Sequence, residues 1–393
     1  MLEDDSGRIQ LVGGVLKSVI LVTGCIIAVL GIEKADGELD VIDLKFPDLA
    51  PQPGRWELSS PDTKNGSKST KRETKVKEED VEMTDSRSAG SGGKIAIVSG
   101  LEFSGVDTSY AMELDLLLEY LLGESLDPAT QKELSHISRL IIAGNSVAPD
   151  RKSQVEDAVE KTTQKKYGYD SSAYNALPAQ LLDDFLSELL PTMPVTLLPG
   201  VLDPANSSFP QQPIHSAMFS KARSFTAVPG SAEPGWFDPV TNPWEGEVEG
   251  WRLLGTGGQN VEDMARYVDS DDRLGMMEAM CRWRCSAPTA PDTLCEFYAQ
   301  TGPPLVSLCL PGSLTRHFAG AYPFQDDEPF VMMECPHLYF VGCQPEFGTK
   351  IIQGTEGQTV RLIAVPSFSA TGEIVLVDSE TLDVTKVKIS VAS

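Results

Sequence analysis

Three short apolar segments, each closing on a glycine turn, constrain the fold of this chain more than any other feature of its sequence. They are residues 95–98, 140–143 and 195–198, followed by Gly100, Gly144 and Gly200. Apolar runs of this length, bounded by turns, are typical of buried strands. Further strands are expected at residues 251–254, 337–341, 360–364, 374–378 and 387–391. Strand and helix patterns alternate first and strands dominate the end, so the sequence predicts a layered α/β sandwich.

The clearest helix pattern spans residues 177–190, with Pro178 suited to a first helical turn. We expect six residues to form its apolar face against four polar ones. The apolar set is Leu181, Leu182, Phe185, Leu186, Leu189 and Leu190, and the polar set is Asp183, Asp184, Ser187 and Glu188.

Residues 1–57 show a different pattern, with strands expected at 9–12, 19–22, 26–30 and 39–44. Four short strands indicate part of a small β-barrel, whose front we expect to be missing because its edges are left open. The apolar run 19–32 is shorter than the roughly 18–20 residues that span a bilayer. We interpret it as two buried strand segments around Gly24, and expect no membrane association.

A polar segment separates the two patterns. Within residues 59–93 only Val76, Val81, Met83 and Ala89 are apolar, too few to offset the entropy of ordering the chain. We therefore divide the chain into a partial barrel (1–57), a disordered linker or insertion (58–93) and an α/β domain (94–393). Five basic residues between Lys68 and Lys77 fit either a nuclear localisation signal or a solvated charge run.

Charge excludes one broad class of function. The chain has 32 basic and 57 acidic residues, and residues 59–93 hold seven of each, which leaves 25 basic against 50 acidic residues elsewhere. A general nucleic-acid binder needs a clustered basic surface, so any contact with DNA is expected to be indirect. Seven cysteines, an odd number, and no basic leader before an apolar core favour a soluble protein of a reducing, intracellular compartment.

The turns that follow the strands resemble the signature of calcineurin-like metallophosphoesterases. That signature runs D-x-H, G-D, G-N-H-D/E and G-H-x-H, and its Asp, His and Asn side chains hold two metal ions that activate water. Here the corresponding strings are Ser99-Gly100-Leu101, Gly144-Asn145-Ser146, Gly200-Val201-Leu202-Asp203-Pro204 and Gly342-Cys343-Gln344-Pro345. The glycines align with the family pattern, whereas the ligand positions do not.

The resemblance places eight residues at degenerate ligand positions: Ser99, Leu101, Asn145, Val201, Leu202, Asp203, Cys343 and Pro345. Valine, leucine and proline side chains offer no donor atom, and Asp203 beside Pro204 suits a turn. We therefore expect no catalytic residue, no metal and no cofactor.

Longer strings resemble the B-family accessory subunits of replicative DNA polymerases, and within them the small-subunit family of DNA polymerase delta. They start at Asp48 (DLAPQ), Leu140 (LIIAGN), Phe209 (FPQQPIH), Leu254 (LGTGGQN), Ser286 (SAPTAPDTL) and Phe347 (FGTKII). The resemblance implies an oligonucleotide/oligosaccharide-binding (OB) barrel followed by an inactive phosphoesterase sandwich. It also implies a nuclear, non-catalytic scaffold for DNA replication and repair. Its partners would be the Cys-rich C-terminal module of the catalytic subunit of DNA polymerase delta and the third subunit of that complex.

The chain departs from that family pattern at residues 296–320, which fit either a real loop or a gene-model error, and at residues 223–238, where we expect a surface loop. Scattered residues suggest two further kinds of site. A zinc site is not expected, because the spacing of the candidate ligands does not match known zinc motifs; the candidates are Cys281, Cys285, Cys295, Cys335, His337 and Cys343. A tight turn is expected at Gly255-Thr256-Gly257-Gly258, and packing roles at His337, Trp236, Trp244 and Trp251. The alternatives left open are a residual phosphoesterase using Asp203, Asn145 and His337, and direct single-strand binding by the barrel.

Overall fold

The computed structural model describes residues 1–4, 6–55, 93–105, 110–124, 131, 137–148, 175–206, 208–228, 235–290, 320–321 and 328–391. The expected linker lies outside these residues apart from Gly93, whose carbonyl accepts a hydrogen bond from the Ser379 N–H. Cys295 and all of 296–320 except Gly320 lie outside them too.

A six-stranded sheet contains the three segments that follow the polar region. Its order is β17-β16-β5-β6-β7-β9, with β5, β6, β7 and β9 parallel and β16 and β17 antiparallel at one edge. The strands are β5 (Lys94–Val98), β6 (Ile137–Ala143), β7 (Val195–Leu198), β9 (Phe237–Pro239), β16 (Glu373–Asp378) and β17 (Val384–Lys388). The three apolar segments are thus confirmed as strands, whereas the last strand begins three residues before the expected 387–391.

A five-stranded sheet lies against it. Its order is β10-β11-β13-β15-β14, and β11, β13 and β15 run parallel. The strands are β10 (Trp244–Val248), β11 (Trp251–Thr256), β13 (Leu338–Gln344), β14 (Gly348–Gln353) and β15 (Thr359–Pro366). Aliphatic side chains of both sheets, with Phe340, form one buried cluster between them. A small pair, β8 (Ser208–Phe209) and β12 (Gly320–Ala321), lies apart from the two sheets.

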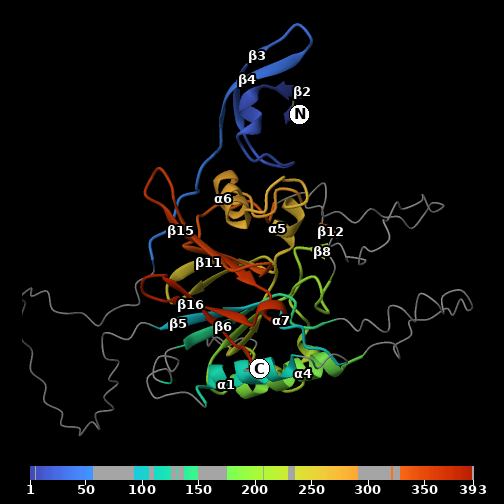
Figure 1. The fold of residues 1–393 in the computed structure, drawn as a ribbon, viewed down its shortest axis with the longest axis vertical. Helices are drawn as coiled ribbons and strands as arrows, with labels where there is room; N and C mark the ends of the chain where they lie inside the picture. Colours follow the sequence, from blue (N-terminus) through green and yellow to red (C-terminus); the bar gives the residue numbers. More distant parts are fainter. Residues whose placement is uncertain are drawn as a thin grey trace, which may run out of the picture.

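Helices cover the outer faces of both sheets, so the α/β part has four layers (Figure 1). The six-stranded sheet is covered by α1 (Ala111–Leu122) and α4 (Leu177–Leu189), and the five-stranded sheet by α5 (Gln259–Met264) and α6 (Arg273–Trp283). Short helices complete the fold: η1 (Gly14–Lys17), η3 (Ser216–Met218), η4 (Ala222–Phe225) and α7 (Phe368–Thr371). The layered α/β fold expected from the sequence is therefore present.

Helix α4 forms where its pattern predicts, but two of its residues lie on the opposite side from the one expected. Leu181 is exposed, whereas Asp183 is buried. The Asp183 carboxylate accepts hydrogen bonds from the backbone N–H groups of Lys221 and Ala222 and from the Ser220 hydroxyl, at 2.8–2.9 Å. A buried acid with all these donors anchors the segment 216–225 on the helix, which a polar/apolar pattern does not reveal.

The region expected as a surface loop, residues 223–238, is partly regular in its described portion. It contains the end of η4 and the start of β9, and β9 forms the edge of the six-stranded sheet next to β7. Phe237 is buried and its ring meets that of Phe219 edge to face. The loop expectation is wrong for these residues, because the apolar Phe225 and Phe237 pack into the main core.

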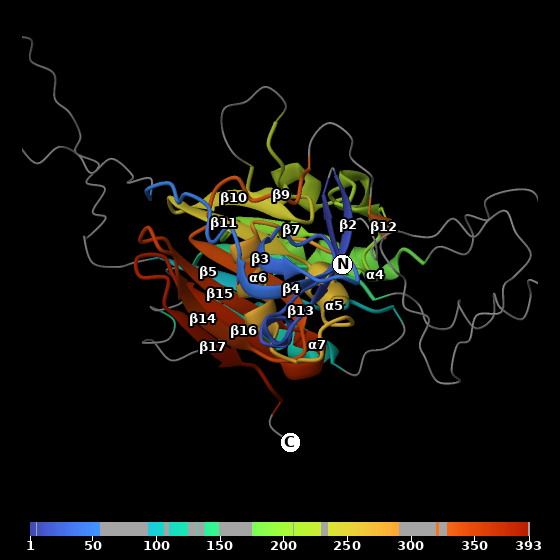
Figure 2. The same cartoon turned by 90° about the horizontal axis from the view of Figure 1, so that it is seen from above.

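The N-terminal unit is a four-stranded sheet that stands above α5 and α6 (Figures 1 and 2). Its order is β1-β2-β4-β3, from β1 (Leu2–Asp4), β2 (Gly7–Val12), β3 (Ala28–Glu33) and β4 (Glu38–Lys45). Residues 19–22 are not a strand, and residues 19–32 are not buried: Ile26, Leu30 and Ile32 are 62–65% exposed. Instead Ile20, Val22 and Cys25 pack as irregular chain against the cluster around α6.

An extended strap, residues 46–55, joins this unit to the five-stranded sheet. The Arg284 guanidinium donates to the carbonyls of Pro47, Asp48 and Leu49 at 2.8–3.2 Å. The Gln52 side chain both donates to and accepts from the backbone of Thr359, at 2.8 and 3.0 Å. Among the described residues, no helix is long and apolar enough to cross a membrane.

Candidate functional site

The turns at the carboxyl ends of the parallel strands meet at one edge of the two sheets, where ligands bind in open α/β folds. A Cβ added to Gly144 would lie 2.9 Å from the Gly257 Cα and 3.2 Å from the Gly200 Cα. One added to Gly342 would lie 2.0 Å from the Ala143 carbonyl oxygen. Only glycine allows backbones to approach this closely, which explains why the glycines of the motif remain.

Ser99 follows β5 and lies where the resemblance places the first metal ligand. Its hydroxyl bonds to β13 and β15 of the five-stranded sheet. It donates to the Pro366 carbonyl at 2.9 Å and accepts from the Cys343 N–H at 2.9 Å. Leu101, two residues on, is fully buried in the cluster under α1 and α4. Neither side chain therefore offers a free metal-ligating atom at this edge of the sheets.

Asn145 and Asp203 are the two side chains at these positions with oxygen donors typical of a metal site, and both oxygens of Asp203 are engaged. The Asn145 Oδ1 accepts from the Leu202 N–H at 3.0 Å. The Asp203 carboxylate accepts from the Gly200 N–H at 2.6 Å and the Val147 N–H at 2.9 Å. Burial raises the pKa of Asp203 to about 6, although these amide donors act in the opposite direction.

The remaining positions do not supply ligands. Val201 and Leu202 carry hydrocarbon side chains and Pro345 is exposed. Burial, with the nearby negative charges of Asp203 and Glu102, raises the pKa of the Cys343 thiol, so its thiolate form is disfavoured. This donor set does not fit a two-metal centre, and among the described residues no group of three or more His, Cys, Asp or Glu side chains could hold a metal ion.

His337 does not join Asn145 and Asp203. It lies just before β13, whereas Cys343 is near the other end of that strand, about 20 Å away at roughly 3.3 Å per residue. Its Nδ1 accepts from the Arg252 N–H at 3.2 Å, and burial lowers its pKa. The constellation of the residual phosphoesterase is therefore not assembled.

Two of the described cysteines and the glycine string 255–258 have packing roles. Cys281 and Cys335 are buried free thiols, and burial raises the pKa of both. The string 255–258 ends β11 and leads into α5, with Gly258 at a φ of +105°. Trp251 packs edge to face on His337, with ring centroids 5.1 Å apart.

A buried amide network beside the turns was missed by sequence reasoning. Asn242 is fully buried; it donates to the Pro199 carbonyl and the Gln259 Oε1 at 2.9 Å and accepts from the Gly257 N–H at 3.0 Å. The Gln211 Nε2 donates to the Gly200 carbonyl at 3.1 Å. The network joins the ends of β7 and β11, and so holds the two sheets together at the edge where the resemblance places metal ions.

The signal for this network was present in the family strings. Gln211 belongs to FPQQPIH, and Gln259 and Asn260 belong to LGTGGQN. The Asn260 Nδ2 donates to the Ser286 carbonyl at 2.6 Å and the Tyr339 hydroxyl at 3.0 Å. Within these strings Gln211, Gln259 and Asn260 are buried and hydrogen-bonded, so their substitution is costly.

Comparison with known proteins bears on both parts of the chain. Residues 95–349 match the DNA polymerase alpha/epsilon B-subunit family, and residues 1–44 match the DNA polymerase delta subunit OB-fold domain. The chain is 30% identical to the DNA polymerase delta small subunit of Saccharomyces cerevisiae, over 100% of this chain and 70% of that protein. It is 31% identical to the protein of the same name from Oryza sativa (98% and 72%) and 31% identical to DNA polymerase delta subunit 2 of Drosophila melanogaster (100% and 73%).

Proposed function

The chain belongs to the DNA polymerase delta small subunit family, and from this premise we propose that it is a non-catalytic accessory subunit acting in DNA replication. The proposal includes an OB domain at 1–57, a linker at 58–93 and an inactive phosphoesterase-type domain at 94–393. The partners would be the catalytic subunit, through its C-terminal Cys-rich module, and the third subunit. DNA would be reached only through them, and the protein would work in the nucleus.

One observation supports the proposal that the chain is not catalytic. The oxygen atoms that Asn145 and Asp203 could offer to a metal accept hydrogen bonds from backbone N–H groups of the neighbouring turns instead. Metal binding would have to break these bonds inside a buried edge, and each amide left without a partner costs free energy. The Ser99 hydroxyl is occupied in the same way, because it bonds to the backbones of β13 and β15 instead of a metal.

Phosphodiester hydrolysis in the presence of Mn²⁺ tests this part of the proposal. We expect the full chain to hydrolyse bis(p-nitrophenyl) phosphate no faster than buffer containing Mn²⁺. The Asn145→Ala variant serves as the control for contaminating enzymes. Turnover that needs Mn²⁺ and disappears in Asn145→Ala would favour the residual phosphoesterase instead.

A further inference from the structure

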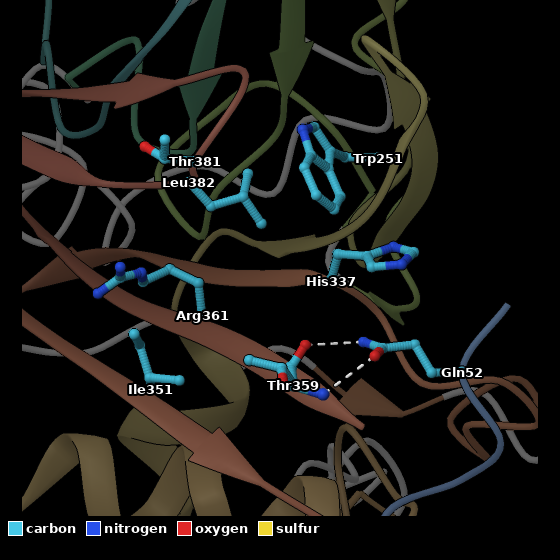
Figure 3. A pocket seen from close by; sticks show the side chains of 8 residues that line it. All are labelled: Gln52, Trp251, His337, Ile351, Thr359, Arg361, Thr381 and Leu382. Atoms are coloured by element: carbon cyan, nitrogen blue, oxygen red, sulfur yellow. Dashed lines mark hydrogen bonds between the residues drawn. The ribbon is translucent and has the colours of Figure 1, made fainter. Parts of the chain in front are cut away.

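A cavity of about 260 Å³ opens at the edge of the sheets opposite the degenerate turns (Figure 3). Trp251 begins β11, His337 precedes β13 and Thr359 begins β15, so the cavity lies at the amino ends of the parallel strands. The strap contributes Gln52 to its wall. The degenerate phosphoesterase turns take no part in this cavity, and nothing in the proposed function assigns it a role.

The walls are largely apolar. Three apolar side chains face the space (Figure 3). They are Trp251 of β11, the half-exposed Ile351 of β14, and the buried Leu382 from the turn between β16 and β17. Sites for whole small-molecule ligands occupy roughly 300–1,000 Å³, so this volume suits one large side chain better.

The polar atoms around the cavity leave a donor unmatched. The Arg361 Nε is buried and has no hydrogen-bond partner among the described residues. The Gln52 amide is engaged with Thr359, and the Trp251 Nε1 donates to the Ser379 carbonyl. An occupant that brought a carboxylate would bind the Arg361 guanidinium in exchange for the exposed carboxylate of Asp383.

Three arginines lie near the cavity, and each is paired with a carboxylate. Arg361 lines the cavity and the Arg55 guanidinium lies 4.3 Å from the centroid of the Trp251 ring. Arg252 does not line it, but its backbone N–H donates to the Nδ1 of His337, which does. Each of these arginines pairs with one carboxylate whose side chain is at least 48% exposed, in Glu380, Glu334 and Asp383. Because the carboxylate of each pair faces solvent, another anion can replace it, although the Arg361 side chain itself is only 13% exposed. Burial lowers the pKa of His337, and the charges of Arg252 and Arg55 lower it further.

The neighbouring strand favours a peptide as the occupant. β14, which carries Ile351, is an edge strand of the five-stranded sheet, and in the described part of the chain its outer side has no strand partner. An extended segment can add to such an edge through main-chain hydrogen bonds while a side chain enters an adjacent pocket.

We propose that this cavity is the anchor site for an extended acidic peptide of a partner protein. One large apolar side chain of the peptide fills the space, and carboxylates next to it bind Arg361 and Arg55. The overall negative charge does not prevent this, because charges farther away than about 8 Å are largely screened at physiological ionic strength.

Fluorescence anisotropy with the full chain tests the proposal, using the fluorescein-labelled peptide Ser-Glu-Asp-Phe-Asp-Glu-Ser as the probe. Two further probes replace its Phe by Ala, or its four acids by Lys and Arg. Arg361→Gln removes the cationic donor and Ile351→Glu places a like charge at the mouth. Ile42→Glu is the matched control, because Ile42 is similarly exposed (55% against 49%) but lies on β4.

We expect saturable binding of the Phe probe that weakens at least tenfold in Arg361→Gln and in Ile351→Glu and is unchanged in Ile42→Glu. The Ala and basic probes should bind at least tenfold more weakly. Equal binding of either probe, insensitivity to both cavity variants, or no saturable signal below about 1 mM would overturn the proposal. So would a dimer mass by light scattering that Ile351→Glu reduces to the monomer mass, since a second copy would then occupy the cavity. Circular dichroism checks that each variant is folded, and none of these results bears on catalysis.

Discussion

Asp203 keeps its residue type at a motif position but is surrounded by peptide groups. Its two oxygens hold the turn after β7 against the turn after β6, through Gly200 and Val147. The same bonds explain its titration: burial opposes ionisation, and the amide donors offset only part of that cost, so the pKa is raised to about 6. A side chain suited to a metal is thus used to join two loops.

The raised pKa of Asp203 predicts a pH dependence. The unfolded chain releases this proton near the ordinary value of 3.8, the folded protein near 6, so the contribution to stability is full below pH 3.8 and lost as the pH rises to about 6. We expect the unfolding free energy of Asp203→Asn, relative to the wild type, to rise by about 2 kcal/mol between pH 4 and pH 7. Urea titrations at several pH values measure it.

Asp183→Asn is the matched control, with the opposite sign. Burial of Asp183 acts against ionisation, but the bonds from Ala222, Lys221 and Ser220 outweigh it and hold its pKa below the ordinary value. The stability of Asp183→Asn relative to the wild type should therefore fall as the pH rises from 3 to 5. Parallel curves for the two variants would contradict the account of both carboxylates.

Asn242 gives a second prediction at this scale. Asn242→Ala would leave the buried Gly257 N–H and Pro199 carbonyl without partners, and we expect it to lower the unfolding free energy by about 2–5 kcal/mol. Asn206→Ala, an exposed amide in the same region, should cost less than about 1 kcal/mol. Equal losses in urea denaturation would mean that the network does not hold the sheets.

Among the elements, those with strong local patterns were predictable. β5, β6, β7 and α4 follow from apolar runs, glycine turns and helical spacing. Helix α6 was not, because its buried Met276, Met277 and Met280 lie among polar residues and glycine without a clear stripe. Residues 19–22 look like a strand but contact the core around α6, so tertiary packing decides their conformation.

The anchoring of the strap on Arg284 is not revealed by sequence patterns, because the bonds from this arginine are accepted by backbone carbonyls. We expect Arg284→Met to remove three of these bonds and to speed hydrogen exchange in residues 46–55 at least tenfold, while β13 stays protected. Mass spectrometry of deuterated peptides measures both segments. Arg223→Met, at an exposed arginine of η4, is the control, and unchanged exchange in Arg284→Met would show that the strap is held by other contacts.

At the scale of the whole molecule, the α/β layering and the family were accessible from the sequence, while the bonding at the carboxyl ends of the strands was not. The resemblance singled out these positions, but only the structure shows that Ser99, Asn145 and Asp203 bond to neighbouring strands and turns. With 25 basic against 50 acidic residues outside 59–93, the chain lacks the basic excess that a general DNA-binding surface needs, in agreement with the proposed accessory role.

The mass of the complex formed with the catalytic subunit tests the central claim most directly. The full chain is co-expressed with the C-terminal Cys-rich module of the DNA polymerase delta catalytic subunit, and the purified sample is measured by size exclusion with light scattering. We predict one peak with the summed mass of one copy of each protein. Two separate peaks at the individual masses, with both proteins folded and at micromolar concentration, would contradict the assignment as an accessory subunit.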